Sequence, residues 1–430
     1  MNMFKSLSVL TFMLVACYFA LFSDKALLLS HAQETNTQRE YLTIENAVEI
    51  AINNNPIINS RKHHIETSEG RIRQAKLLPN PEIELFTEET PTNEIGLGQS
   101  QNMVSLSQKL EIGGKRKLRT KVARKEKGVL ELDFKTAVVD ITAKVKKAFF
   151  KVLTVQDELK FAEETVEIAK SLKNLSDEKY KAGDIAKIEV LKAEIELSNA
   201  KMKVQEAERK NINSIKRLQT TMGVPETSLK ILFPISIADV PSLQLEKLND
   251  LLLKNYPALK AQKKVVDLSL LKVSEAKRNA IPDINASVGY KRLSATDEDT
   301  IQAGIKLPLP IFNRNQGKII EARALSFKAK DDETNVRNEL LLQLSNAFSL
   351  YSSTREQVSY FVDTIIPQAE ESLKISKQGY KHGEFDYLEV LDAQRTLANT
   401  RVSYLKILNE LFSSMIEIEK LVGVKISDIK

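Results

Sequence analysis

Cysteine, tryptophan, glycine and proline are scarce in this sequence of 430 residues. The single cysteine, Cys17, excludes an intrachain disulfide bond. No proline occurs between Pro91 and Pro225, or after Pro367. Because proline removes a helix hydrogen bond and clashes with the preceding turn, these proline-free stretches permit very long helices.

Neither sign of charge is in large excess. The 63 basic and 57 acidic residues leave a net charge of +6. The two signs are interspersed, as is typical of solvated helix faces. The charge balance therefore gives no reason to expect a nucleic-acid partner.

No group of residues typical of an enzyme or a cofactor site is found. His63 and His64 are adjacent, so they point in different directions on a helix, and no histidine, cysteine and carboxylate set has the spacing of metal ligands. A glycine-rich phosphate loop is also absent. We expect a protein that is not an enzyme and has no cofactor, and that takes any energy from a partner.

The first 32 residues are typical of an export signal. An apolar run from Leu7 to Phe22 is followed by Ser30-His31-Ala32, which offers the small residues that a signal peptidase needs. We expect residues 1–32 to be a signal peptide that is cleaved after Ala32. Two alternatives remain open: the apolar run is a membrane anchor, or the Leu-Val-Ala-Cys sequence that ends at Cys17 is a lipobox and Cys17 carries lipid.

One half of the chain repeats the other. Residues 180–201 and 380–401 align without a gap, and both contain Tyr-x-x-Gly followed by Glu-Val-Leu-x-Ala. The period is too long for a solenoid, so it indicates two structural copies of one unit. We expect repeats at residues 33–224 and 242–424, a connector at 225–241 and a C-terminal tail at 425–430.

Each half is expected to contain a helix, two strands, a long helix, a turn and a shorter helix. Alternation of apolar and polar residues predicts strands within about 82–112 and 283–310, the last strand covering 301–309. Long helices are expected at 117–180 and 318–380. Apolar residues from Phe134 to Ala169 recur at four and three residues, a coiled-coil pattern. Two apolar rows in the last helix indicate either helix neighbours on both sides or one broad buried face.

The strands match transmembrane β-barrel strands, with one apolar and one polar face. An ordinary half-buried sheet has the same pattern. In lipid every backbone polar group must be paired, so a membrane sheet must close on itself. Four strands cannot enclose a lumen, and several chains would therefore have to contribute strands to one barrel.

Together these features resemble the TolC-type outer membrane factors, the exit ducts of tripartite efflux pumps. The segments that follow each strand pair, 108–116 and 308–317, resemble the branch that serves heavy-metal RND pumps. The resemblance implies a mainly helical homotrimer with four strands per chain in a twelve-stranded transmembrane β-barrel. An α-helical tunnel would continue the barrel across the periplasm. The implied partners are outer membrane lipid, a periplasmic adaptor and an inner-membrane RND pump.

The resemblance also implies roles for the two turns, at about 180–189 and 380–392. In the family these tips meet the adaptor and hold the channel closed, which here involves Tyr180, Gly183, Tyr380 and Gly383. Acidic residues of the second tip form the narrowest ring in the family, and they correspond to Glu389 and Asp392, with Glu189 as the equivalent acid of the first tip.

Rings of carboxylates favour cations over anions. The alternative is that these three acids belong to a solvated helix face. Two positions depart from the family pattern. Phe385 stands where some relatives have an arginine that braces the closed tip, and Lys192 stands at the position equivalent to Asp392.

The resulting hypothesis is a passive outer membrane exit duct, with heavy-metal cations as its cargo. A multidrug channel and a type I protein secretion channel are alternatives within the same class. A periplasmic coiled-coil scaffold without a channel would account for the heptads but not for the strand pairs.

Overall fold

The computed structural model describes residues 42–88, 100–225, 241–294 and 296–429. The predicted signal peptide with Cys17, most of the loop between the first two strands and most of the connector lie outside the described residues. The elements that follow all belong to one unit, which begins at Thr43.

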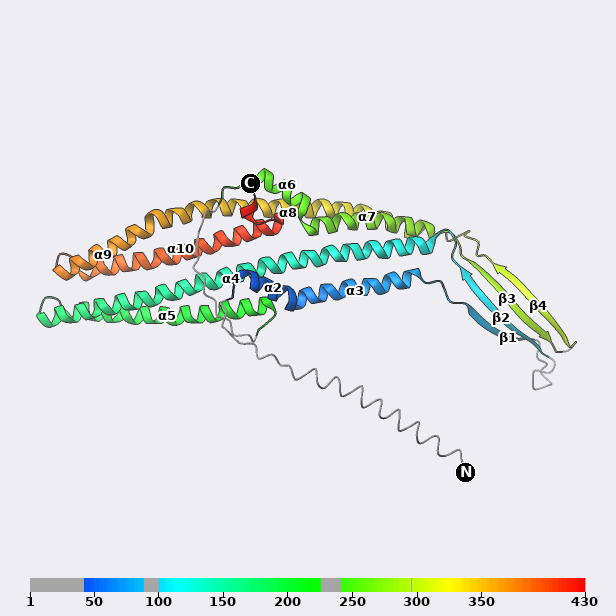
Figure 1. The fold of residues 1–430 in the computed structure, drawn as a ribbon, viewed down its shortest axis with the longest axis horizontal. Helices are drawn as coiled ribbons and strands as arrows, with labels where there is room; N and C mark the ends of the chain where they lie inside the picture. The colour runs from blue at the N-terminus through cyan, green and yellow to red at the C-terminus, as the bar shows by residue number, and fades with distance from the viewer. Residues whose placement is uncertain (1–41, 89–99, 226–240, 295, 430) are drawn as a thin grey trace, which may run out of the picture. The chain divides into compact units, whose positions relative to one another are not determined.

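The two halves have the same order of elements (Figure 1). The helices of the first half are α2 (Ile44–Asn54), α3 (Pro56–Lys76), α4 (Lys115–Ala182) and α5 (Lys187–Met222). The second half contains α6 (Leu245–Asn255), α7 (Pro257–Arg278), α8 (Gln316–Tyr360), α9 (Ile366–His382) and α10 (Tyr387–Val422), and a 3-10 turn follows at Ile426–Asp428. In the first half α2, α3 and α5 all pack along the single long helix α4.

The coiled-coil pattern of α4 corresponds to its buried face. Ile141, Val145, Val152 and Val155 are all almost fully buried. Helix α10 packs against α4, α8 and α9. Its two apolar rows therefore reflect helix neighbours on more than one side.

The second long helix, expected at 318–380, contains an irregular turn that the apolar pattern did not predict. A five-residue π-helical turn, Phe361–Ile365, separates α8 from α9. The physical reason is Pro367, which has no N–H to donate to the carbonyl four residues before it. The extra residue in this turn accommodates the proline without ending the helix.

In each half, an asparagine at the junction of the two short helices forms a hydrogen bond to the end of a third helix. The junctions are α2–α3 and α6–α7, and the third helices are α5 and α10. Asn55 lies between α2 and α3, and its Nδ2 donates to the carbonyl of Thr221, 2.8 Å away. In the second half Nδ2 of Asn255 donates to the carbonyl of Val422, at 3.1 Å. Glycines with positive φ, Gly223 and Gly423, then end α5 and α10. Both repeats therefore contain the same asparagine–carbonyl hydrogen bond beside a glycine that ends the helix.

Gly223→Ala is expected to destabilise the fold by about 3 kcal/mol, against about 1 kcal/mol for Gly183→Ala. Both glycines have positive φ, 81° and 83°. A Cβ at Gly223 would lie 2.7 Å from the backbone oxygen of Asn54, whereas one at Gly183 meets nothing within 4 Å. Denaturant unfolding of the two variants measures the difference, and equal losses would contradict this reading of the contact.

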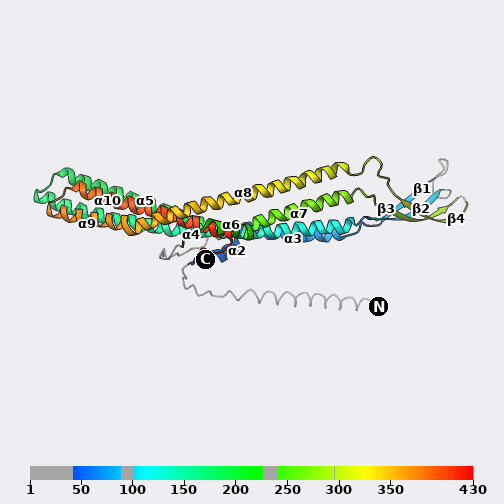
Figure 2. The same ribbon diagram turned by 90° about the horizontal axis from the view of Figure 1, so that it is seen from above.

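The four strands form one antiparallel sheet in the order β1 (Glu82–Glu88), β2 (Gln101–Leu110), β3 (Ile284–Leu293) and β4 (Glu298–Lys306). The expected last strand was placed too late in the chain. It begins at Glu298 and ends at Lys306, because Pro308 and Pro310 cannot donate to a strand ladder. Figures 1 and 2 show the strands beyond the ends of α3, α4, α7 and α8.

One face of the sheet is apolar and exposed. Ile83 pairs with Leu106, which in turn pairs with Val288, so apolar side chains continue from strand to strand. The most exposed members are Ile301 and Ile305 of β4, at 81% and 79%. We call this set the apolar band; it comprises Ile83, Leu85, Val104, Leu106, Val288, Tyr290, Ile301 and Ile305.

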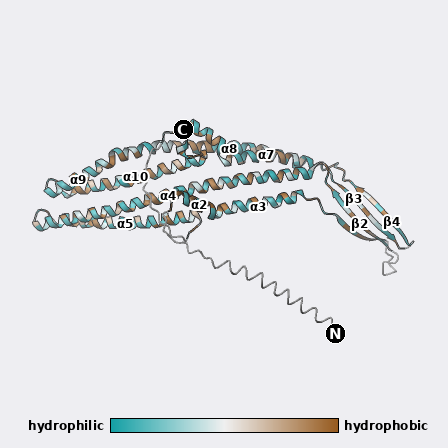
Figure 3. Cartoon of the chain, viewed as in Figure 1, coloured by the Kyte–Doolittle hydropathy of each residue, from teal (hydrophilic) through white to brown (hydrophobic). Residues whose placement is uncertain are grey.

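Hydrophilic and hydrophobic residues are interspersed along the helices (Figure 3). Among the helices that the structure describes, none has a stretch both long and apolar enough to span a membrane.

Candidate functional site at the helical turns

The two predicted tips are tight helix–turn–helix reversals with the same backbone geometry. Gly183 follows α4 and Gly383 follows α9, with φ of 83° and 78°. In each turn the glycine N–H and the next N–H bond back to carbonyls of the preceding helix, which is a Schellman motif. Glycine suits these positions because a side chain is unfavourable at positive φ.

The equivalent tyrosines of the two turns have different environments. Tyr180 is 45% exposed, whereas Tyr380 is 2% exposed. The Tyr380 hydroxyl lies 3.0 Å from the hydroxyl of Ser176 on α4, and its ring meets Tyr387 edge-on. Lys179 lies over the ring of Tyr380, 5.1 Å from its centroid. Tyr380 thus joins the second turn to the first helical hairpin.

Burial raises the pKa values of the two phenols in this cluster. It raises the pKa of Tyr380, and together with the nearby Glu196 carboxylate it raises the pKa of Tyr387 to about 12. Both hydroxyls are neutral at physiological pH, as ordinary tyrosines are, and either the Tyr380 or the Ser176 hydroxyl can donate the hydrogen bond between them.

Of the three predicted gate acids, Glu389 and Asp392 are exposed and Glu189 is half-buried. Glu389 and Asp392 lie three residues apart near the start of α10, so they are neighbours on its surface. Glu189 lies in the first turn of α5. None of the three forms an ion pair within the described residues. The structure of one chain brings Glu389 and Asp392 together, and their role at a constriction stays a prediction.

Phe385, which stands where the resemblance places an arginine in some relatives, makes an apolar contact. Its ring packs directly on the backbone of Gly379, since a Cβ built on that glycine would lie 2.2 Å from the ring. An apolar contact within one turn therefore stands where an arginine would make polar contacts.

Ion pairs near the turns join the hairpin of α4 and α5 to the hairpin of α9 and α10. Arg395 of α10 contacts Glu196 of α5 at 2.9 Å. Arg401 binds both Glu164 of α4, at 2.7 Å, and Glu370 of α9, at 2.8 Å. The hairpins of the two halves are thus held side by side by charged contacts as well as by apolar packing.

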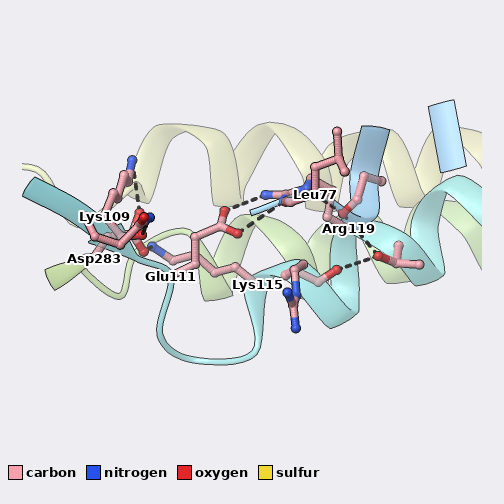
Figure 4. A network of polar contacts seen from close by, with 10 residues as sticks. Leu77, Lys109, Glu111, Lys115, Arg119 and Asp283 are labelled. Atoms are coloured by element: carbon pink, nitrogen blue, oxygen red, sulfur yellow. Dashed lines mark hydrogen bonds and ion pairs between the residues drawn. The ribbon is translucent and has the colours of Figure 1, made fainter. Parts of the chain in front are cut away.

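A second polar network lies where the helices meet the sheet (Figure 4). Asp283, directly before β3, accepts from Lys115 at 2.6 Å and lies 3.3 Å from Lys109. Arg119 pairs with Glu111 and also donates to the carbonyls of Ala75 and Leu77 at the end of α3. These contacts connect α3, α4, β2 and β3 at one corner, which we call the junction network.

The sequence contained only part of the signal for this network. Lys115 and Arg119 lie four residues apart in a segment already notable for its motif. Glu111 lies only eight residues before Arg119, but Asp283 lies 168 residues from Lys115. No pattern along the chain links such residues.

Among the residues that the structure describes, no cluster of three or more histidine, cysteine or carboxylate side chains is arranged to hold a metal ion.

The comparison with protein families identifies the class. The family model of the outer membrane efflux protein matches residues 47–224 and 248–424, one match for each repeat. The chain therefore belongs to the outer membrane efflux protein family, and it is an outer membrane protein. Members of this family are channels rather than enzymes.

Individual relatives agree with this assignment. The chain is 28% identical over 382 residues to the cobalt-zinc-cadmium resistance protein CzcC of Cupriavidus metallidurans, covering 89% of this chain and 90% of that protein. The nickel-cobalt-cadmium resistance protein NccC of Alcaligenes xylosoxydans xylosoxydans is 24% identical, covering 57% of this chain and 56% of that protein.

The fold matches solved outer membrane channels. The structure of CusC superimposes with a TM-score of 0.76 at 17% identity, covering 89% of this chain and 92% of that one. The expected fold class, mainly helical with a small strand part of the TolC type, is confirmed.

Proposed function

We propose that this protein is the passive outer membrane exit duct of a tripartite efflux system, and that heavy-metal cations are its cargo. Three chains form a twelve-stranded barrel, and the helices continue it as a periplasmic tunnel. A periplasmic adaptor and an inner-membrane RND pump deliver the cargo to the turns. The duct needs no energy source of its own.

The observation that carries the channel is the apolar band on a sheet with two open edges. Strands β1 and β4 each lack a neighbour on one side within the described chain. An edge with unpaired backbone groups cannot face lipid, so the sheet must be completed by other chains. The apolar band then faces lipid and the opposite, polar face lines the lumen. The end of the sheet that adjoins the helices then lies on the periplasmic side of the membrane.

Metal cations are favoured as cargo by the relatives and by the turns. CzcC and NccC are resistance proteins for cobalt, cadmium, and zinc or nickel. The exposed acids Glu389 and Asp392 would give six carboxylates in a trimer, which suits cations. A duct passes its cargo without retaining it, so this function does not require a binding site with metal-ligand spacing.

Growth of a deletion strain tests the function. We expect higher sensitivity to cobalt, zinc, cadmium or nickel ions, restored by the wild-type gene. Complementation should fail with Ile301→Arg, which places a charge in the apolar band, and should succeed with Gln302→Arg on the opposite face of the same strand.

Other outcomes would change the assignment. Sensitivity to dyes and antibiotics alone would move the protein to the multidrug branch. Release from outer membranes by carbonate would contradict the barrel and favour a periplasmic scaffold.

A further inference from the structure

Basic residues gather where the helices meet the sheet. Four helix ends adjoin one end of the sheet: the last turns of α3 and α7 and the first turns of α4 and α8. Strands β1 and β3 start at this end of the sheet, and β2 and β4 finish there. Residues 71–76, 116–124, 277–278 and 314–323 contain thirteen basic residues and one acidic residue, Glu321.

Twelve of these basic side chains are exposed, and none forms an ion pair within the described residues. We call them the basic collar; they are Arg71, Arg73, Lys76, Arg116, Lys117, Lys121, Arg124, Lys277, Arg278, Arg314, Lys318 and Arg323. The thirteenth, Arg119, belongs to the junction network.

Nearby carboxylates neutralise the collar only in part: Glu69 interacts electrostatically with Arg73, but its hydrogen bond is to Lys127. Glu69, Glu126 and Asp267 are engaged by Lys127, Lys272 and Lys125. Glu82 and Glu84 lie on the polar face of β1, opposite the apolar band, since Ile83 and Leu85 alternate with them.

The opposite end of the helices has no such excess. At the two turns, residues 179–194 and 381–392 together contain five basic and seven acidic residues. General solubility would not require such a difference between the two ends of the same helices. The collar therefore indicates an anionic partner at the sheet end.

Part of the collar forms a regular stripe. Lys117, Lys121 and Arg124 are spaced by four and three residues, so they share one face of α4. This face points away from the buried Val122 and Ala123. The stripe is available to a surface beside the helix.

We propose that the basic collar binds anionic phospholipid headgroups in the periplasmic leaflet of the outer membrane. This inference rests on the proposed function, which places the end of the sheet next to the collar at that membrane surface. Lysine and arginine both pair with phosphate oxygens, and basic residues beside a membrane are attracted to anionic lipid.

The dimensions agree with this assignment. Residues 115–124 of α4 extend about 14 Å from the sheet end. A headgroup layer about 6 Å deep and a screening length of about 8 Å together cover the same distance. The collar residues of α4, Arg116, Lys117, Lys121 and Arg124, thus lie within reach of the charges of one leaflet. The bound lipid would hold the duct at a fixed depth.

The test uses the full-length protein in nanodiscs of equimolar phosphatidylethanolamine and phosphatidylglycerol. Native mass spectrometry counts the lipids that remain bound after release. We expect phosphatidylglycerol to be enriched on the wild-type protein, and this enrichment to fall with salt. The stripe variant Lys117→Gln, Lys121→Gln, Arg124→Gln should lose at least about fivefold of the enrichment.

The matched control is Lys201→Gln, Lys203→Gln, Arg209→Gln on α5. It removes two lysines and one arginine that are equally exposed and form no ion pair in the described chain. This variant should keep the wild-type enrichment. Equal enrichment in both variants would overturn the proposal, as would a stripe variant that alters ion selectivity but not bound lipid, because the stripe would then face the lumen.

Failure of the proposed function gives a different result. A wild-type protein that does not integrate into nanodiscs would overturn the barrel itself. Integration with normal conductance but without lipid preference would overturn only the basic collar.

Discussion

Neutralising the acids of the second turn, with Glu389→Gln and Asp392→Asn, is expected to lower the cation-over-anion permeability ratio of the channel by about tenfold. In the proposed trimer the two positions supply six carboxylates to one constriction. Charges a few ångströms apart around a narrow opening act together on a passing ion, because little water lies between them to screen it. Reversal potentials of single channels in a salt gradient measure the ratio.

Two variants sharpen this experiment. Glu163→Gln with Glu167→Gln removes the same charge from exposed positions of α4 away from the turn, and should leave the ratio unchanged. Lys192→Glu adds a carboxylate at the position equivalent to Asp392 and should raise the ratio. If all three variants behave alike, these acids belong to a solvated helix face.

Replacing Asp283 by asparagine is expected to destabilise the folded chain by about 2 kcal/mol. The change keeps the shape of the side chain but leaves Lys115, whose side chain is only 10% exposed, without its carboxylate. An unpaired charge that is largely removed from water raises the free energy of the folded state. The corner between α4 and β3 should therefore loosen. Denaturant unfolding followed by circular dichroism measures the loss.

Asp297→Asn is the matched control. Asp297 also forms an ion pair, with Arg292, but its side chain is 82% exposed. Asparagine accepts the positive φ of this position, 58°, as readily as aspartate. An exposed ion pair contributes little, so the loss should stay below about 0.5 kcal/mol. A similar loss in both variants would contradict a special role for Asp283.

The same pair predicts a pH dependence. Partial burial alone would raise the pKa of Asp283, but hydrogen bonds from Lys115 and Lys109 outweigh it and lower the pKa below its ordinary value. Because the pKa of Asp283 is lowered in the folded state, its ion pairs contribute their full stabilisation at pH values above the ordinary carboxyl pKa. It is lost as the pH falls through the lowered pKa. The stability difference between wild type and Asp283→Asn should shrink only in that acidic range.

Much of the fold follows from local patterns. The four–three spacing in α4, the alternation in the strands and the glycines of the two turns each depend on residues close together in the chain. Such patterns predicted the repeat, the helices, the strand pairs and the family. The local signal was weaker for two details: β4 was placed too late in the chain, and the π-helical turn before Pro367, inside the second long helix, was missed.

The sequence by itself determined the duplicated plan of this protein, because periodicity and turn residues act over a few positions. Only the tertiary structure decided which copy of a shared motif is buried. Tyr180 and Tyr380 stand in the same motif, yet only Tyr380 packs between hairpins and meets Ser176, 204 residues away. Asp283 likewise acquires its partners through the pairing of β2 with β3. Contacts between distant segments depend on how the two repeats pack, and the motif that the two turns share cannot encode that difference.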